Sequence, residues 1–422
     1  MTCSCPEYQS GMTRRGFLRR AAAAGAAGAV AAFAGDSLAG SLAYASPGYT
    51  GDVLVVVSLR GGFDGLSAVV PHGDPSYYKA RPTIGVPKAR LIGGNSMFGL
   101  HPALAPLLPW WNAGKLAAVH AVGQKTPTRS HFAAMEAMER AAPGTSIRTG
   151  WIDRMLGVQG ASSPLNGVSI GSLQPQSLNG PAPKLGLRTV DGFEMSGDTP
   201  STPMAATLRQ LYADAPPLLA TPAANTLTAL TTTAEVSATA YTPANGAAYP
   251  NTELGNGLSS IAQLIKADVG LMTAAVDYGD WDMHENLGTA TTGQRMHTHL
   301  ADFAATLAAF AKDLGSAGLA KVTLITLSEF GRRVGENASR GLDHGNGNAM
   351  FVLGGGVRGK KVYGSWPGLG PAKLVDGDLR GTTDYRSVIG EILQKRCGHG
   401  SLAPVFPGVK PTSFGLVTAR TG

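Results

Sequence analysis

The sequence predicts an α/β protein with a mostly parallel, doubly wound sheet and helices on both faces, and three observations support this prediction. Residues 53–59 (VLVVVSL) form a continuous β-branched run, which is typical of a strand buried on both faces of a parallel sheet. Further apolar runs are separated by amphipathic helical patterns. Polar clusters follow several of these runs, and ligands of open α/β sheets bind where the strands end.

Residues 1–45 are predicted to be a twin-arginine signal peptide that is not part of the fold. The motif at 13–18 (TRRGFL) precedes an Ala/Gly run at 21–34, and residues 43–45 (AYA) match a cleavage site. The apolar run is too short to span a bilayer. We therefore expect export by the twin-arginine translocase, a periplasmic or extracellular location and no transmembrane segment after cleavage. The alternative is a basic N-terminal helix.

Residues 46–422 are predicted to form a single α/β domain, and this region is long enough to bury one large core. Helices are expected before Gly114 and over residues 300–314, where apolar side chains recur at helical spacing until Gly315. The strand candidates, assigned from short apolar runs, lie at residues 53–59, 116–122, 167–170, 270–277, 322–327 and 349–353.

Residues 213–257 interrupt the alternation of strands and helices. They are rich in Ala, Thr, Pro and Asn and contain few large apolar side chains. We interpret them as a helix-and-loop insertion over the strand ends. This insertion is either a lid or a solvated surface excursion, and the sequence favours neither.

Charge and cysteine content exclude some classes of protein. The formal net charge is +7, part of it in the predicted signal, and the absence of a dense Lys/Arg stripe argues against nucleic-acid binding. A mildly positive mature protein suits an anionic small molecule or an envelope polymer as its substrate. Cys397 is the one cysteine outside the predicted signal, so no internal disulfide is expected.

Carboxylates and imidazoles follow two of the predicted strands. Asp64 comes after residues 60–63 (RGGF), whose glycines let the backbone turn sharply next to a ligand. This aspartate is either a metal ligand or the cap of a following helix. Asp280, Asp282 and His284 follow a later strand, and a carboxylate and an imidazole at this spacing favour a metal such as zinc. Which of the two aspartates binds stays open.

Two further clusters have the same character. Glu329 stands just beyond the strand at 322–327, and Arg332 either pairs with it or holds an anionic substrate. His344 lies beside glycines at the start of a strand, where it is free to coordinate an ion. Asp343 is expected either to bind the metal as well or to orient the imidazole.

Ser130 and His131 open a predicted helix whose Phe132 and Met138 are expected to face inward. Ser130 is placed at the N-cap or in the first turn, where free N–H groups favour an anion. It is either a capping serine or a nucleophile, with Arg129 beside it. The sequence leaves His131 undecided among a ligand, a base and a core histidine.

These motifs, in this order, resemble a family of twin-arginine-exported proteins that carry a large domain of unknown function and are placed with the alkaline phosphatase/sulfatase superfamily. The resemblance spans residues 53–393 and implies an alkaline-phosphatase-like fold with two metal ions at the strand ends. The motifs are residues 59–66 (LRGGFDGL), 81–82 (RP), 100–104 (LHPAL), 129–132 (RSHF), 281–286 (WDMHEN), 328–332 (SEFGR) and 343–345 (DHG).

The resemblance also implies roles for single residues, with two departures from the superfamily pattern. Phe330 stands where the superfamily has a histidine, so one metal lacks a ligand unless His131 or Asp343 supplies it. The superfamily's spacing to the histidine is met by Asp280, whereas the closer family uses the position of Asp282. Carried over residue by residue, the metal ligands are Asp64, Asp282, His284 and His344, with Glu329 as a further ligand in place of the superfamily's aspartate, and the nucleophile is Ser130.

These expectations combine into a metal-dependent hydrolase or transferase that acts on phosphate or sulfate esters in the cell envelope. Ser130 is the expected nucleophile, and Arg129 or Arg332 is expected to hold the non-bridging oxygens. Histidine and carboxylate ligands favour zinc or manganese, with two ions per chain if the site is complete. The alternative is a non-catalytic envelope binding or assembly protein with a reduced metal site.

Overall fold

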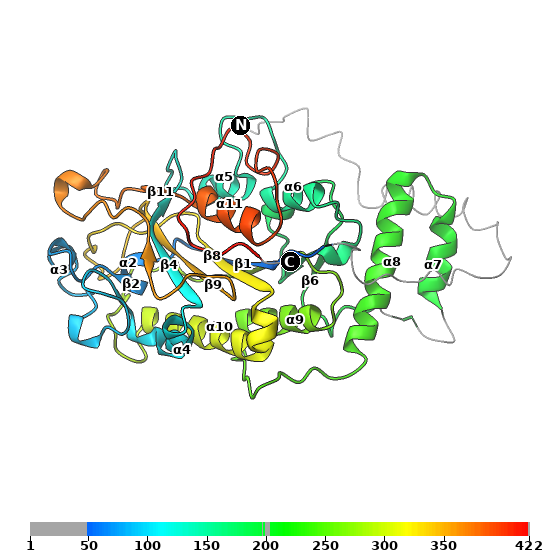
Figure 1. The fold of residues 1–422 in the computed structure, drawn as a ribbon, viewed down its shortest axis with the longest axis horizontal. Helices are drawn as coiled ribbons and strands as arrows, with labels where there is room; N and C mark the ends of the chain where they lie inside the picture. The colour runs from blue at the N-terminus through cyan, green and yellow to red at the C-terminus, as the bar shows by residue number, and fades with distance from the viewer. Residues whose placement is uncertain (1–48, 196, 199–202, 421–422) are drawn as a thin grey trace, which may run out of the picture. The chain divides into compact units, whose positions relative to one another are not determined.

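The computed structural model describes residues 49–195, 197–198 and 203–420 (Figure 1). The predicted signal peptide lies outside these residues. The chain divides into a smaller unit that includes Met195–Leu230 and a larger unit that includes Ala43–Glu194 and Thr231–Gly422. The larger unit contains the sheet and the candidate site.

A nine-stranded sheet forms the centre of the larger unit, with the strands in the order β10-β4-β9-β8-β1-β7-β5-β6 and β11 paired to β4. All six predicted strands are present, with small shifts at their ends. The strands are β1 (Val53–Leu59), β4 (Leu116–Gly123), β5 (Gly167–Ile170), β6 (Leu185–Leu187), β7 (Thr273–Tyr278), β8 (Val322–Leu327), β9 (Asn348–Gly354), β10 (Val362–Tyr363) and β11 (Thr383–Asp384); β2 (Val69–Val70) and β3 (Gly99–Leu100) pair separately.

The sheet is mostly parallel but mixed, because β9 runs antiparallel to both of its neighbours, β4 and β8. The other pairings within it are parallel. The chain between Leu327 and Asn348 returns to the sheet at the edge where β8 ends, so β9 runs back in the opposite direction. The predicted mixture of strands and helices is confirmed, and likeness to alkaline phosphatase stays a prediction.

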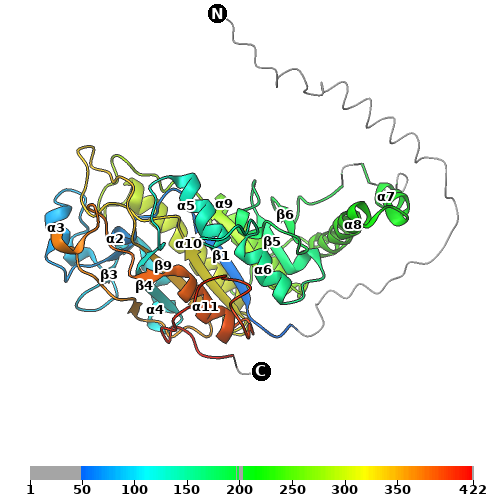
Figure 2. The ribbon, with the colours of Figure 1, turned by 90° about the horizontal axis from the view of Figure 1, so that it is seen from above.

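Helices cover both faces of this sheet: α5, α6 and α11 lie on one face and α4, α9 and α10 on the other (Figure 1 and Figure 2). A 3₁₀ helix at Pro102–Leu107 precedes α4. The helices are α2 (Gly65–Ala68), α3 (Ser76–Ala80), α4 (Leu108–Asn112), α5 (His131–Arg140), α6 (Trp151–Val158), α7 (Met204–Ala213), α8 (Pro217–Ser237), α9 (Glu253–Lys266), α10 (Arg295–Leu319) and α11 (Tyr385–Lys395).

Apolar side chains fill the space on both faces of the sheet. Leu54 of β1 packs in one buried cluster with Trp151 of α6. On the opposite face the ring centroid of Phe303, from α10, lies 5.8 Å from that of Phe351, from β9. Side chains alternate along a strand, so a central strand needs apolar residues at every position. This explains the continuous apolar run from which β1 was predicted.

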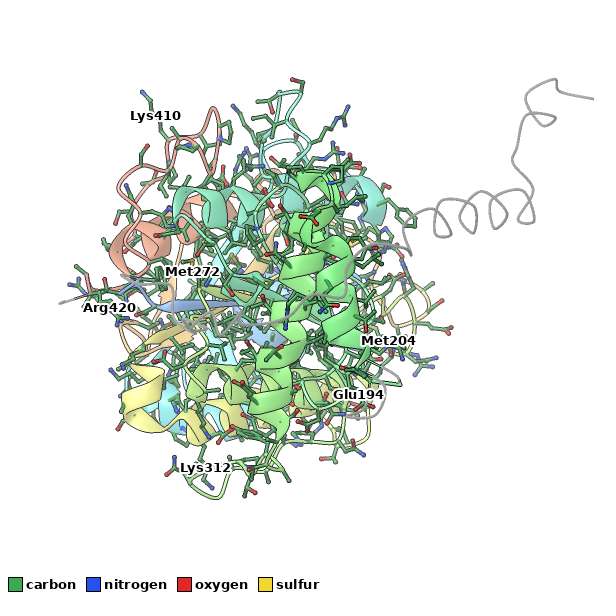
Figure 3. The ribbon with its side chains drawn as sticks, turned by 90° about the vertical axis from the view of Figure 1, so that its right-hand side faces the viewer. Glu194, Met204, Met272, Lys312, Lys410 and Arg420 are labelled. Atoms are coloured by element: carbon green, nitrogen blue, oxygen red, sulfur yellow. The ribbon has the colours of Figure 1, made fainter. Side chains whose placement is uncertain are left out.

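Side-chain positions agree with this layering. Met272, just before β7, lies inside the molecule, whereas Lys312 and Lys410 project outward (Figure 3). The apolar stripe predicted over residues 300–314 is buried in α10, and the non-helical backbone at Gly315 interrupts that helix as the glycine signal indicated. No helix within the described residues is long and apolar enough to cross a membrane.

The insertion predicted at residues 213–257 overlaps the smaller unit only in part. Helix α8 begins in that unit and ends in the larger one. The chain after α8 is fixed to α10 by Asp313, which accepts hydrogen bonds from the hydroxyls of Tyr241 (2.6 Å) and Tyr249 (2.9 Å) and from the N–H of Ala244 (2.6 Å). This part of the predicted insertion is therefore anchored to a helix of the larger unit.

Buried His120 makes the fold sensitive to acid. It is 1% exposed, donates from Nε2 to the carbonyl of Val69 (2.9 Å), and accepts at Nδ1 from the N–H of Ala121 (2.9 Å). The bond accepted at Nδ1 requires a neutral ring, because a protonated ring carries a hydrogen on that nitrogen. Burial is the largest effect on the pKa of His120 and lowers it from 6.5 to about 4, despite the bond to Val69.

We therefore expect the free energy of unfolding to fall as the pH drops from 6.5 to about 4. In this range His120 binds a proton in the unfolded chain but stays neutral in the folded protein. His120 alone accounts for about 3 kcal/mol of this loss. The difference between the wild type and His120→Gln, measured by urea unfolding at pH 7.5 and pH 4.5, isolates the effect. An equal pH dependence in the two proteins would contradict the prediction.

Candidate metal centre

Four loops bring the predicted site residues to one edge of the sheet: those after β1, β4 and β7 and the one that joins β8 to β9. Strands β7, β1 and β8 are adjacent and parallel, so the loops that follow them meet at this edge. Because β9 is antiparallel, it begins at this edge, and β4, antiparallel to β9, ends there. His131 opens α5 after β4, and His344 precedes β9. The topology therefore collects side chains that lie far apart in the sequence.

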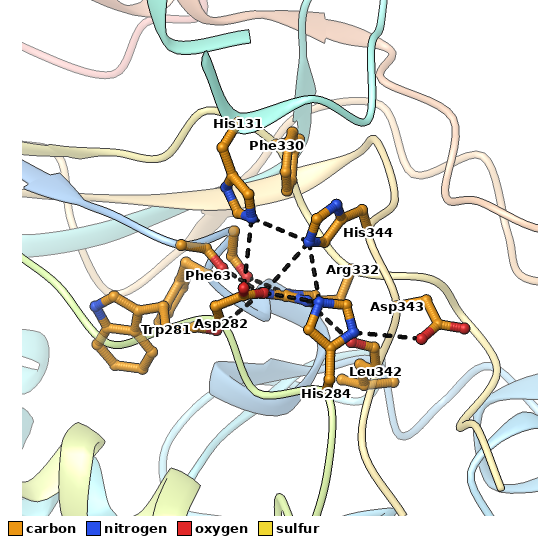
Figure 4. A network of polar contacts seen from close by, with 12 residues as sticks. Phe63, His131, Trp281, Asp282, His284, Phe330, Arg332, Leu342, Asp343 and His344 are labelled. Carbon is orange, nitrogen blue, oxygen red and sulfur yellow. Dashed lines mark hydrogen bonds and ion pairs between the residues drawn. The ribbon is translucent and has the colours of Figure 1, made fainter. Parts of the chain in front are cut away.

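Three histidines and one aspartate converge here, and we call His131, Asp282, His284 and His344 the metal cluster (Figure 4). The Nε2 atom of His344 lies 3.0 Å from Nε2 of His131 and 3.0 Å from Nε2 of His284. One oxygen of Asp282 lies 2.9 Å from Nε2 of His284, and the other lies 3.6 Å from Nε2 of His131. Ligand atoms of His131, Asp282 and His344 all fall within 4.8 Å of one another.

The far nitrogen of each imidazole in the metal cluster faces a hydrogen-bond acceptor. Histidines that bind a metal almost always donate from their second nitrogen to a carboxylate, a carbonyl or water, which fixes the tautomer and the ring orientation. The three pairs are Nδ1 of His131 with Oε1 of Glu329 (2.7 Å), Nδ1 of His344 with the carbonyl oxygen of Arg129 (2.8 Å) and Nδ1 of His284 with Oδ1 of Asp343 (3.4 Å).

The close acceptors at Nδ1 of His131 and His344 leave the Nε2 atoms of these two rings as acceptors that point at each other. A neutral imidazole that donates from Nδ1 carries a lone pair on Nε2, and we assign this tautomer to both rings from the acceptors at Nδ1. Their Nε2 atoms, 3.0 Å apart, then repel, because no hydrogen lies between them, while Nε2 of His284 faces Oδ1 of Asp282 at 2.9 Å. A cation removes this repulsion. Tetrahedral zinc, with Zn–N bonds of about 2.0–2.1 Å, holds its ligand nitrogens about 3.3 Å apart, so the cluster fits a metal ion.

Asp282 supplies the negative charge of the metal cluster. Burial raises the pKa of this carboxyl, but the hydrogen bond and charge of Arg332 outweigh burial, helped by His284 and His344, and the pKa falls to about 2. The Nη2 atom of Arg332 lies 2.6 Å from Oδ1 of Asp282. Asp282 is therefore ionised at neutral pH, with one oxygen held from behind by Arg332.

Arg332 ties together the loops that carry the metal cluster. It is 1% exposed. Its guanidinium donates to the carbonyls of Gly62 (2.6 Å), Leu342 (2.9 Å) and Trp281 (3.1 Å), and also to that of Gly61. These carbonyls follow β1, precede β9 and follow β7. Arg332 was expected to hold an anionic substrate, but its donors are engaged with the protein itself.

Glu329 lies behind the metal cluster, whereas the sequence predicted it as a ligand. It is 2% exposed. Its Oε1 accepts from Nδ1 of His131 and from the backbone N–H of Gly61 (2.9 Å), and its Oε2 accepts from the hydroxyl of Ser328 (3.1 Å). Both oxygens are therefore occupied, and Glu329 orients His131.

Asp64, like Glu329, is hydrogen-bonded to other parts of the protein. Its two oxygens accept from the Arg81 guanidinium at 2.6 and 3.0 Å, and its Oδ2 caps α2 through the N–H of Ser67 (3.1 Å). Burial opposes ionisation of Asp64, but Arg81 outweighs it and lowers the pKa. Of the two roles considered from the sequence, the helix cap is the one observed, and both oxygens are engaged away from the metal cluster.

Asp280 and Asp282 face different partners in the structure. Asp280 faces α10, where it lies 3.0 Å from Nη2 of Arg295 and 3.4 Å from Nε2 of His299. Asp282 faces the three clustered histidines. Asp343, the other acidic residue left open, orients His284 from the rim of the site.

Ser130 and Arg129, both predicted to act in catalysis, lie beside the metal cluster with partners of their own. Ser130 is the N-cap of α5, where its hydroxyl accepts from the N–H of Ala133 at 3.5 Å. Nη2 of Arg129 lies 2.8 Å from Asp378. The inward orientation predicted for Phe132 is wrong, because its ring is 83% exposed, whereas Met138 is buried as predicted.

His131 is the residue that sequence reasoning left undecided, and the structure makes it part of the metal cluster. The signal that identifies it is its pairing with Glu329, which lies 198 positions further along the chain. No local sequence pattern predicts this pairing. It follows from the neighbouring positions of β4, β9 and β8 in the sheet.

Comparison with known proteins places the chain in a family. A search of curated proteins returned no match. A family model described as a protein of unknown function (DUF1501) matches residues 116–386, which is more than half of the chain and includes all four residues of the metal cluster. The chain therefore belongs to the DUF1501 family.

Proposed function

We propose that this protein is an exported, divalent-metal-dependent hydrolase or transferase that acts on phosphate or sulfate esters in the cell envelope. The observation that carries the proposal is the convergence of three imidazole Nε2 atoms and one carboxylate, with an acceptor facing Nδ1 of each imidazole. Structural ion pairs do not need facing imidazole lone pairs, whereas a metal site does. The export half of the proposal rests on the signal motif in the sequence.

Zinc or manganese is the metal that we propose, because the ligands are imidazole nitrogens and a carboxylate oxygen with no thiolate. The described residues offer one such group, so we propose one ion held by the metal cluster. A second ion, expected from the superfamily resemblance, needs ligands such as Asp64, whose oxygens are bound to Arg81 here. The ion that we propose at the metal cluster supplies Lewis acidity and lowers the pKa of water bound to it.

The residues of the metal cluster are arranged to admit a substrate. The side chains of Asp282 and His284 are 46% and 44% exposed, while the residues behind them, Arg332 and Glu329, are buried. The ligands are therefore held rigidly from behind and are open in front. Ser130 is exposed and stands one residue before His131, so we keep its hydroxyl and water as the two candidate nucleophiles.

One observation favours the alternative, an envelope binding or assembly protein with a reduced metal site. The two arginines expected to hold the substrate's oxygens are engaged: Arg129 with Asp378, and Arg332 with Asp282 and backbone carbonyls. An ester hydrolase usually presents free donors to the charge that develops in the transition state. In this chain the metal would have to supply most of that stabilisation.

Metal analysis and turnover of the same sample separate the two functions. The mature protein is purified without chelator, its metal content is measured by mass spectrometry, and hydrolysis of 4-nitrophenyl phosphate and 4-nitrophenyl sulfate is followed with added zinc or manganese. We expect about one ion per chain, and hydrolysis that EDTA abolishes and the metal restores. Metal binding without turnover of either ester supports the binding protein, and a protein that takes up no metal overturns both readings of the site.

A further inference from the structure

We propose that a cavity on the His284 side of the metal cluster binds a small organic anion, whose apolar body fills the cavity and whose charge is held by Lys79. The cavity has a volume of about 450 Å³, within the range of small-molecule sites. As a statement about the substrate, this inference rests on the function proposed above. As a statement about binding, it stands alone and is tested alone.

Part of the cavity wall is apolar and packs against a buried cluster. Val334 and Leu369 line it and are 1% and 2% exposed. They belong to a buried cluster against which Ala80 and Leu374, also lining residues, are packed. A rigid apolar surface of this kind favours an aromatic or branched aliphatic group, because burying such a group removes apolar area from water.

Four charged side chains line the cavity: the carboxylates of Glu336 and Asp343 and the cations of Lys79 and Arg333. Glu336 lines the cavity but is occupied by the backbone N–H groups of Thr83 and Ile84. Arg333 lies 3.6 Å from Asp378. Lys79, in the last turn of α3, also lines the cavity and has no ion-pair partner among the residues that the structure describes. An incoming anion therefore meets a lysine whose charge is not already neutralised.

Asp343 connects the cavity to the metal cluster. This residue lines the cavity and also accepts from Nδ1 of His284 (3.4 Å). It lies beyond His284 and away from His131 (Figure 4). The backbone N–H of Arg333, another lining residue, donates to the carbonyl of Asp343 (2.9 Å). A group bound in the cavity is thus held next to one metal ligand, which is where the organic part of an ester has to lie.

The volume and the walls also narrow the substrate class. A cavity of about 450 Å³ takes a group of one or two rings and gives no room for the interior of an extended polymer. Of the two substrate classes that the charge of the protein allows, the cavity favours the small organic molecule over the envelope polymer.

Two dyes that differ in one charge test this inference without turnover. 8-Anilinonaphthalene-1-sulfonate has an aromatic body and a sulfonate, and N-phenyl-1-naphthylamine has the same body without the charge. We expect saturable fluorescence enhancement with both dyes. Lys79→Met is expected to weaken binding of the sulfonate about fivefold and to leave binding of the neutral dye unchanged, since only the charged dye loses a charge-assisted contact.

A filling substitution locates the binding. Gly335 lines the cavity, and a Cβ atom added there would lie 3.8 Å from the carbonyl oxygen of Ala80, which is an ordinary contact, so Gly335→Leu is chosen to place a side chain at the cavity wall. We expect this variant to bind both dyes at least about tenfold more weakly than the wild type. The matched control is Gly157→Leu, at a position in α6 with nothing within 4 Å of the added atom. Circular dichroism checks that both variants are folded.

The outcomes separate this inference from the proposed function. Equal binding of both dyes to the wild type and Gly335→Leu overturns the cavity proposal, whatever the metal content. Loss of both dyes in Gly335→Leu together with unchanged binding by EDTA-treated protein supports it even if no ester is hydrolysed. If Lys79→Met binds the sulfonate as tightly as the wild type, the assignment of the charge to Lys79 is wrong.

Discussion

Replacing His344 with alanine is expected to abolish stoichiometric metal binding. Its Nε2 atom is the centre of the metal cluster, 3.0 Å from the Nε2 atoms of His131 and His284 and 3.3 Å from Oδ1 of Asp282. Loss of a residue that only orients a ligand costs about 10–100-fold in metal affinity, and loss of the ligand itself costs more. We therefore expect the Kd for zinc to rise by more than about 100-fold.

Isothermal titration with zinc measures this change, and a graded series makes it specific. Glu329→Gln removes the carboxylate behind His131, and its affinity is expected to fall between those of the wild type and His344→Ala. His297→Ala removes an imidazole outside the metal cluster and serves as the control. Zinc is also expected to raise the Tm of the wild type but not that of His344→Ala, because only a ligand that binds the native state stabilises it. If His344→Ala bound zinc as tightly as the wild type, the metal cluster would be ruled out as the zinc site.

Much of this centre was predictable because the apolar runs in the sequence show where the strands end. The run at 53–59 and the run at 322–327 are apolar at every position, which identified them as central strands. Polar residues directly after such strands reach the edge where ligands bind. On this basis the predicted set already contained Asp282, His284 and His344, three of the four residues that converge.

Asp64 and Glu329 were predicted as ligands but have protein partners in the structure, and the sequence gives no sign of the difference, because a carboxylate that follows a strand has the same local pattern whichever partner it faces. Asp64 is bound by Arg81, 17 positions later, and Glu329 faces His131 across 198 positions. Neither pairing has a spacing or a periodicity that a sequence displays. Pairing depends on strand order, and the antiparallel placement of β9 between β4 and β8 is what brings His131 to the site.

Arg332→Met is expected to unfold the site more than any change to a ligand does. The guanidinium is buried and donates to Asp282 and to the carbonyls of Gly61, Gly62 and Trp281. Methionine fills a similar volume but removes the donor from the carbonyls of Gly61 and Gly62, while the carbonyl of Trp281 keeps the N–H of Met283. Each carbonyl left without a donor costs about 1–3 kcal/mol, and loss of the pair with Asp282, whose side chain is 46% exposed, adds about 1 kcal/mol.

Urea unfolding of the metal-free proteins measures this loss without a contribution from the ion. The control is Arg333→Met, because Arg333 is the next residue, its side chain is 40% exposed and its nearest carboxylate oxygen is 3.6 Å away. The Asp378 side chain is 7% exposed, but an ion pair this long with a partly exposed arginine contributes about 1 kcal/mol. Loss of less than about 1 kcal/mol in Arg332→Met as well would show that the loops hold their shape without this arginine.

Arg332→Lys distinguishes the charge of this residue from its geometry. Lysine can still neutralise Asp282, but a single ammonium group cannot reach carbonyls that follow β1, follow β7 and precede β9. If the charge alone matters, the lysine variant keeps both its stability and its affinity for zinc. We expect it to remain as unstable as Arg332→Met within about 2 kcal/mol, because fixing three loops at once requires the planar fork of donors that arginine provides.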